Sequence, residues 1–323
     1  MRAVVCKAFG PPENLVVETV EDPRPGEGEV VVDVRAVAVT FPDTLIIQDL
    51  YQFKALPPFI PGTEAAGVVS AVGAGVDDVS VGDDVVGWGF TGGFAERVAF
   101  PVAEVRPMPR GLNYAEATGF GYAYGTSYYG LKFRGDLQPG ETLLVLGAAG
   151  SLGLATIELG KLLGARVIAA ASTPEKLALC RERGADETIN YDLEDLKNRA
   201  KELTGGEGVD VVFDSVGGDY AEAAYRATNW RGRHLVVGFT AGIPRIPLNL
   251  SLLKGSSIVG VFWGAARTKE PELFQTMLRE LDDYAAAGDL RPLVSRRCSL
   301  EEVPQALRDI VDRKALGKIV AEP

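Results

Sequence analysis

An apolar run in the middle of the chain ends in a cluster of small residues, LLVLGAAGSLG, at positions 143–153. Its spacing matches the glycine fingerprint of dinucleotide-binding loops, with alanine in place of the first glycine. Gly150 would let the backbone approach a pyrophosphate, Gly153 would let helix and strand pack closely, and the helix N-terminus would supply free N–H groups. The pattern therefore predicts a bound dinucleotide. The predicted contact residues are Ala148, Gly150, Ser151, Leu152 and Gly153.

The end of the next predicted strand, ARVIAAAST, indicates which dinucleotide binds. NAD-binding proteins usually place an acidic residue about twenty positions further on, where its carboxylate accepts hydrogen bonds from the ribose hydroxyls. Here the strand ends in Ala171, Ser172 and Thr173, without an acid. Ser172 and Lys176 could hydrogen-bond and neutralise a 2′-phosphate, which favours NADPH. The alternative is that Ser172 and Thr173 only cap the helix and that Lys176 is solvated.

The elements that must position this loop divide the chain into three parts. Up to about residue 122, short β-rich runs separated by Pro and Gly predict an antiparallel, barrel-like domain. Strands and helices then alternate, which predicts a doubly wound parallel sheet of the Rossmann type. The tail carries two helices and a last strand, GKIVAE, and is predicted to fold back onto the first part. The predicted domains are 1–122 with 265–323, and 123–264.

Composition and charge narrow the possible partners. The 323 residues include 33 basic and 44 acidic side chains, a net charge of -11, which argues against a nucleic-acid surface. Small molecules or further copies of the chain are the expected partners. Neither a signal peptide nor an apolar stretch of membrane-spanning length is evident, so we expect a cytoplasmic protein that binds no membrane.

Metal and hydrolase chemistry lack the necessary side chains. The three cysteines are far apart, and His234 is the sole histidine. A catalytic zinc takes about three protein ligands and a structural zinc about four, so no metal site is predicted. A Ser-His-Asp or Cys-His arrangement would have to use His234, which opens the apolar segment HLVVGFT and is expected to be structural.

Five segments together carry a family resemblance: PFIPGTEAAGVV, YGTSYYGL, GAAGSLGLATIELGKLLGARVIAAAST, LTGGEGVDVVFDSVGG and RKALGKIV. In this order and spacing the chain resembles the zinc-independent branch of the medium-chain dehydrogenase/reductases, and within it the NADPH:quinone oxidoreductases. Zinc-dependent relatives carry His where this chain has Thr63. The resemblance implies a GroES-like β-barrel domain, a Rossmann domain, a cofactor in the cleft between them, and a homodimer.

The resemblance also implies further cofactor contacts. Thr126 would touch the nicotinamide end, whereas Tyr191 and Arg313 would lie near the adenosine phosphate, with Lys318 as a weaker neighbour. For Arg313 and Lys318, solvated ends of a helix and a strand are the alternative. Three aromatic residues lie at or just beyond strand ends, where open α/β sheets bind ligands, but core or dimer-interface packing would explain them equally. These residues are Phe239, Phe262 and Trp263.

Two residues of the segment VTFPDTLIIQDLYQ are the candidate catalytic positions. Relatives usually have Asn where this chain has Thr40, and Tyr51 matches a tyrosine that lines the active site and serves as a proposed proton donor in related enoyl-thioester reductases. A buried aromatic in a loop is the alternative for Tyr51.

Without a metal to polarise a carbonyl, the acceptor of a hydride must already be electrophilic. A quinone is the first prediction. A C=C bond conjugated to a carbonyl, in an enone, enal or enoyl thioester, is the alternative. Its reduction leaves an enolate whose carbon must be protonated, and Tyr51 could be the acid. A non-catalytic NADPH-binding sensor or structural protein is the third possibility.

Overall fold

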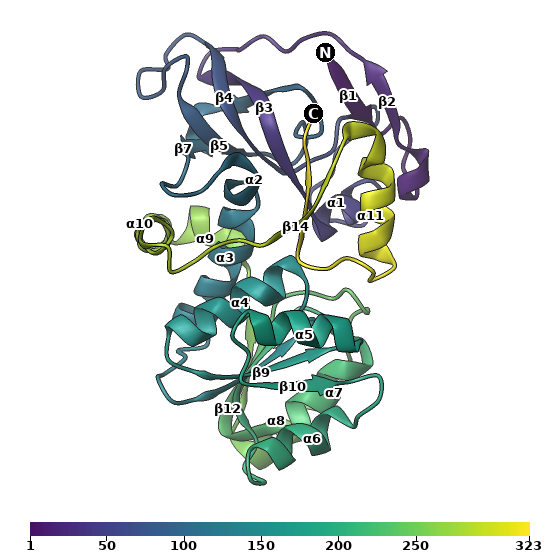
Figure 1. Cartoon of the computed structure of the whole chain (residues 1–323), viewed down its shortest axis with the longest axis vertical. Helices are drawn as coiled ribbons and strands as arrows, with labels where there is room; N and C mark the ends of the chain where they lie inside the picture. Colours follow the sequence, from purple (N-terminus) through teal and green to yellow (C-terminus); the bar gives the residue numbers. More distant parts are fainter. The chain divides into compact units, whose positions relative to one another are not determined.

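The computed structural model describes residues 1–323, which form two compact units (Figure 1). Unit 1 comprises residues 1–122 and 285–323, and unit 2 comprises residues 123–284. The tail thus belongs to unit 1, but it begins later than the predicted residue 265. Residues 265–284 stay with unit 2 because α10 (Pro271–Ala287) packs there: the Tyr128 hydroxyl donates to Glu280 Oε2 at 2.9 Å.

Unit 1 is built on a seven-stranded, mainly antiparallel sheet in the order β14-β15-β3-β4-β5-β7, with β6 also paired to β3. β1 and β2 form a separate two-stranded ribbon. The long strand β3 pairs with β4, β6 and β15. Its alternate valines are buried in one apolar core, which holds it at the centre of the sheet. The strands are β1 (Arg2–Val5), β2 (Val16–Thr19), β3 (Glu29–Val39), β4 (Glu64–Val72), β5 (Asp84–Trp88), β6 (Arg97–Pro101), β7 (Val105–Pro107), β14 (Val294–Cys298) and β15 (Lys318–Ala321).

The C-terminal strand completes this sheet. β15 pairs antiparallel with β3, so that Ile319 lies opposite Val39 and Ala321 opposite Val37. β14 then adds parallel to β15. The helical elements of unit 1 are η1 (Pro12–Asn14), α1 (Phe41–Ile46), η2 (Val102–Glu104), α2 (Tyr114–Ala117), η4 (Leu300–Glu302) and α11 (Val303–Val311).

Unit 2 is a six-stranded parallel sheet in the order β10-β9-β8-β11-β12-β13. The central strands are almost continuously apolar, as is typical of parallel strands that are buried on both faces of the sheet. The strands are β8 (Thr142–Leu146), β9 (Arg166–Ala171), β10 (Glu187–Asn190), β11 (Val209–Asp214), β12 (Thr228–Val236) and β13 (Ser257–Gly260).

Helices follow most of these strands, as an α/β alternation requires. They are α4 (Ser151–Leu162), α5 (Pro174–Glu182), α6 (Leu196–Leu203), α7 (Gly218–Arg226), α8 (Asn249–Lys254) and α9 (Trp263–Lys269), preceded by α3 (Phe120–Tyr128) and η3 (Tyr129–Arg134). None of the helices combines the length and apolar character that a membrane crossing needs. The predicted fold class, a doubly wound parallel sheet with a second, antiparallel β domain, agrees with these two sheets.

Candidate functional site

The strand order of unit 2 locates a ligand crevice. From β8 the chain first builds outward through β9 and β10, and then returns to the other side of β8 with β11 and β12. The order therefore reverses at β8, and open α/β sheets bind ligands beyond the carboxyl ends of the strands at such a point. The loops that follow β8, β9, β11 and β12 are therefore the candidate site.

The loop after β8 has the geometry of a phosphate cradle. Ala148 N–H donates to Ala170 O of β9 at 3.1 Å, which fixes the loop, and Gly150 caps α4. A Cβ on Gly153 would lie 2.4 Å from Gly147 O, so glycine is required there by protein packing alone. A Cβ on Gly150 would meet only Gly147 O, at 3.6 Å, so the protein itself tolerates a side chain. The open space beside Gly150 suits a ligand that approaches the backbone.

Ser151 and Leu152 form the first turn of α4, beyond this cap. The first turn holds no acidic side chain, which leaves the positive end of the helix dipole available to an anion.

The loop after β9 brings the two predicted phosphate residues together. Lys176 Nζ lies 3.2 Å from Ser172 Oγ. The helix cap is Thr173, whose side chain accepts from Lys176 N–H at 3.3 Å, so Ser172 is not the capping residue. Tyr191, just after β10, packs against Tyr220 with ring centroids 4.5 Å apart. A hydroxyl and an ammonium thus face one another after β9, and the nearest acidic residue in the chain, Glu175, lies in the first turn of α5.

Two further loops complete the crevice, and of their residues the sequence analysis named only Phe239 as a candidate contact. Residues 215–218 follow β11 and residues 237–242 follow β12. The first lies directly against the phosphate cradle: a Cβ on Gly147 would lie 2.9 Å from the Val216 side chain and 3.1 Å from Ser215 Oγ. The signal for this loop was the SVGG motif, a glycine pair immediately after a buried strand.

The three aromatic candidates of unit 2 separate into two kinds. Phe239 and Phe262 are 43% and 50% exposed, at the ends of β12 and β13. Trp263 is instead buried, stacked on Phe274 with centroids 4.4 Å apart and an interplanar angle of 26°. This packing favours the core alternative for Trp263, and its contact with the cofactor stays a prediction. Thr126 is buried within α3.

Unit 1 contains the candidate catalytic positions, beginning with Thr40. Thr40 caps α1, and both its backbone N–H and its hydroxyl donate to Asp43 Oδ2, at 2.8 and 2.6 Å. Its one hydroxyl proton is therefore already used within the protein. Burial raises the pKa of Asp43 to about 6, against the hydrogen bonds from Thr40 that lower it.

Tyr51 lies in the loop that follows α1. Burial, reinforced by the nearby charge of Asp43, raises the pKa of Tyr51 above its usual value, so the hydroxyl stays protonated near neutral pH. An aromatic cluster adjoins it: the Tyr51 and Phe53 rings are 5.9 Å apart, and Phe53 and Phe90 4.1 Å apart. Phe53 and Phe90 are both exposed. A neutral hydroxyl beside accessible aromatic rings suits an apolar, flat acceptor.

The two tail candidates differ from one another. Arg313 follows α11 in the left-handed conformation, φ 58°, and is exposed. Lys318 is only 4% exposed, and its ammonium donates to Glu116 O at 2.8 Å and Thr118 O at 2.7 Å. The ammonium of Lys318 is thus held by backbone carbonyls inside unit 1, and its contact with the cofactor phosphate stays a prediction.

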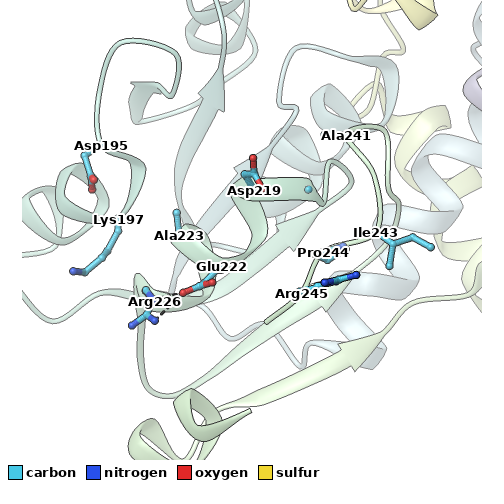
Figure 2. Close-up of a pocket in the computed structure, with 11 residues that line it drawn as sticks. Asp195, Lys197, Asp219, Glu222, Ala223, Arg226, Ala241, Ile243, Pro244 and Arg245 are labelled. Atoms are coloured by element: carbon cyan, nitrogen blue, oxygen red, sulfur yellow. Dashed lines mark hydrogen bonds and ion pairs between the residues drawn. The ribbon is translucent and has the colours of Figure 1, made fainter. Parts of the chain in front are cut away.

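A pocket of about 680 Å³ lies on unit 2, between α6, α7 and residues 241–245 (Figure 2). None of the predicted cofactor residues lines it. Its walls carry charges of both signs, among them the Glu222–Arg226 ion pair at 2.7 Å. It borders the loops after β11 and β12 at Gly218 and Ala241.

Comparisons with known proteins extend these observations to a family. An alcohol dehydrogenase GroES-like domain model matches residues 26–110, and a zinc-binding dehydrogenase model matches residues 151–283. The second description names zinc, but no three His, Cys, Asp or Glu side chains gather as metal ligands in this chain. Fold and site thus define a two-unit, dinucleotide-binding dehydrogenase/reductase.

Individual relatives make the assignment more specific. Quinone oxidoreductase-like protein 2 homolog of Nematostella vectensis is 40% identical over 99% of this chain and 88% of its own length. The Escherichia coli quinone oxidoreductase, solved in complex with NADPH, is 29% identical with a TM-score of 0.90 and full coverage of both chains. The CurK enoyl reductase is 26% identical, with a TM-score of 0.88 over 99% of this chain and 98% of its own. The chain belongs to the medium-chain dehydrogenase/reductase family, quinone oxidoreductase branch.

Proposed function

We propose that this protein is an NADPH-dependent oxidoreductase that transfers hydride to a quinone. The single observation that carries the cofactor assignment is the cradle after β8, where Gly150 leaves space that only a ligand requires. The NADPH complex of the E. coli relative supports the same cofactor. The proposed contacts are Thr126, Ala148, Gly150, Ser151, Leu152, Gly153, Ser172, Lys176, Tyr191, Phe239, Phe262 and Arg313.

The protein's own part in this reaction is binding, orientation and proton supply. Bound NADPH supplies the hydride. The cradle after β8 fixes the cofactor through backbone N–H groups and the dipole of α4. The rings of Phe53 and Phe90 offer an apolar surface to a flat acceptor, and Tyr51 offers a neutral hydroxyl that can donate a hydrogen bond. Thr40 acts by holding Asp43 beside this hydroxyl.

Reduction of an activated C=C bond is the second candidate function. The enoyl reductase CurK has the same architecture, and the protonated Tyr51 could protonate the carbon of an enolate. A quinone needs no such acid, because its reduced oxygens can take protons from water.

Replacing Tyr51 with Phe separates the two acceptors. We expect kcat with 1,4-naphthoquinone to change less than about threefold, because the ring and its apolar contacts remain. For an enone or enoyl thioester we expect a loss of about 10²-fold or more, the contribution of a positioned general acid. Steady-state NADPH oxidation at 340 nm measures both. If wild-type protein binds NADPH but reduces no acceptor of either class, the non-catalytic alternative is correct.

The residues proposed for the 2′-phosphate predict a selective effect. Replacing Lys176 with Met removes an ammonium but keeps the aliphatic stem. Because a hydrogen bond to a charged group contributes about 1.5–3 kcal/mol, we expect kcat/KM for NADPH to fall about tenfold or more. The same ratio for NADH should stay unchanged, since NADH lacks the phosphate. Equal losses with both cofactors would place Lys176 elsewhere in the mechanism.

We also propose a homodimer formed through β13. This strand ends the sheet of unit 2 and offers an unpaired edge, on which Ile258 is 40% exposed. Three more apolar side chains of the neighbouring β12 and of α8 are also exposed: Trp230 in β12, and Leu252 and Leu253 in α8. Such an edge with apolar neighbours suits pairing with a second copy.

Light scattering should give twice the 34.4 kDa chain mass for the wild type. Ile258→Lys should shift the protein to monomers, because the charge would be buried at the pairing edge. Leu193→Lys is the matched control, an 81% exposed leucine outside β13 that should leave the mass unchanged. A monomeric wild type would rule out the dimer.

A further inference from the structure

A buried carboxylate joins the loops at residues 215–218 and 237–242. Asp214, the last residue of β11, is 3% exposed. Its Oδ1 accepts from Val216 N–H at 2.9 Å and from Gly217 N–H at 2.8 Å, so it sets the shape of residues 215–218. Its backbone oxygen accepts from Val237 N–H at 2.9 Å and Gly238 N–H at 3.2 Å, at the start of residues 237–242.

The two loops are also hydrogen-bonded to each other. Ala241 N–H donates to Val216 O at 2.7 Å, and Gly218 N–H donates to Gly242 O at 2.8 Å. A Cβ on Gly218 would lie 2.6 Å from Ala241 O, which shows how closely the two backbones approach. A displacement of one loop therefore displaces the other.

The sole histidine completes this arrangement. His234 Nε2 lies 3.1 Å from Asp214 Oδ2, and the histidine is fully buried, with its ring edge-on to Tyr225 at 5.6 Å. His234 Nδ1 is buried without a hydrogen-bond partner. A carboxylate only accepts, so the contact requires a proton on Nε2, and the bare Nδ1 is best left as the unprotonated nitrogen. The pair therefore holds one defined tautomer.

The position of the pair relates it to one half of the cofactor. A dinucleotide crosses the sheet at the switch point, and the phosphate-binding residues Ser172 and Lys176 lie on the β9 side. The β11 and β12 side, with both loops, is left for the nicotinamide half. We propose that Asp214 and His234 form a positioning pair that fixes residues 215–218 and 237–242 against the nicotinamide half of NADPH. This inference rests on the proposed use of NADPH.

The sole histidine allows a test in the unmodified protein. With ¹⁵N-labelled wild-type protein, NADPH should shift the ring signals of His234, which need no assignment. The fragment 2′,5′-ADP, which lacks the nicotinamide half, should bind and leave these signals in place. The proposal is overturned if NADPH binds without moving them, or if the fragment moves them equally.

Two variants test the effect on turnover. Asp214→Asn and His234→Phe should each lower kcat with 1,4-naphthoquinone at saturating NADPH by about ten- to hundredfold, because small misplacements of the reacting atoms have effects of this size. Affinity for 2′,5′-ADP should change less than about twofold, since the adenosine half binds elsewhere on the sheet. With NADPH deuterated at the transferred position, the isotope effect on kcat should rise as hydride transfer becomes slower.

Asp210→Asn is the matched control. Asp210 lies at the opposite end of the same strand and also accepts a backbone N–H, from Thr142 at 2.8 Å. It should keep the wild-type kcat. Wild-type turnover in Asp214→Asn and His234→Phe, or an equal loss of 2′,5′-ADP affinity, would overturn the proposal. If a variant does not fold, the histidine signals of the wild-type protein still test the proposal. The same signals also test it if naphthoquinone is not an acceptor, because they require no turnover.

Discussion

Replacing Gly150 with Ala is expected to weaken NADPH binding by at least about thirtyfold, or about 2 kcal/mol, while the protein stays folded. Gly150 has φ -79° and ψ 170°, which alanine adopts without strain, and the added Cβ would meet only Gly147 O at 3.6 Å. The loss of affinity would come from the ligand, because the methyl group occupies the space through which the backbone approaches the pyrophosphate. Fluorescence titration of NADPH measures the effect.

Gly153→Ala provides the contrast within the same loop. Its Cβ would lie 2.4 Å from Gly147 O and 2.6 Å from Ala148 Cα, so α4 or the loop must move. Overpacking of this kind costs about 1–3 kcal/mol, and the melting temperature should fall together with NADPH affinity. Gly150→Ala should lower the melting temperature only slightly, because its main cost is a poorer helix cap of about 1 kcal/mol. Unchanged NADPH affinity in Gly150→Ala would contradict the proposed cradle.

Replacing Lys318 with Met is expected to destabilise the protein by about 1–3 kcal/mol, because it leaves two carbonyl oxygens inside unit 1 without their donor. The ammonium donates to Glu116 O and Thr118 O, and its charge acts on the buried Glu64. Burial raises the pKa of Glu64 to about 7 and lowers that of Lys318 to about 7, which reflects the cost of charge in this interior. Urea unfolding measures the loss.

A second substitution and a surface control test this explanation. In Lys318→Met, Glu64 is left without its main positive neighbour, so adding Glu64→Gln should recover part of the stability. Lys161→Met, which breaks a solvent-accessible pair with Asp186, should cost less than about 1 kcal/mol. If Lys318→Met instead lost NADPH affinity at unchanged stability, the result would support the predicted phosphate role of Lys318 and contradict a structural one.

Burial and side-chain direction are what the sequence could not give for Lys318 and Trp263. Lys318 and Trp263 stand in segments of the right family pattern, but a sequence position does not say towards which side a side chain points. In β15, Lys318 faces inward, where two backbone carbonyls take its charge. Trp263 turns onto Phe274 because α10 stays with unit 2 and covers it. Both outcomes depend on packing between segments that are distant along the chain.

The sequence by itself determined the features that rest on neighbouring residues. The cradle at positions 147–153, the acid missing after Ala171, the scarcity of metal ligands and the α/β alternation are all local patterns, and they sufficed for the fold and the family. Only the tertiary structure decided how Asp214, His234 and the loops at 215–218 and 237–242 combine, since their hydrogen bonds join different strands. Such contacts arise when the parallel sheet brings strand ends to one edge, and no local spacing encodes them.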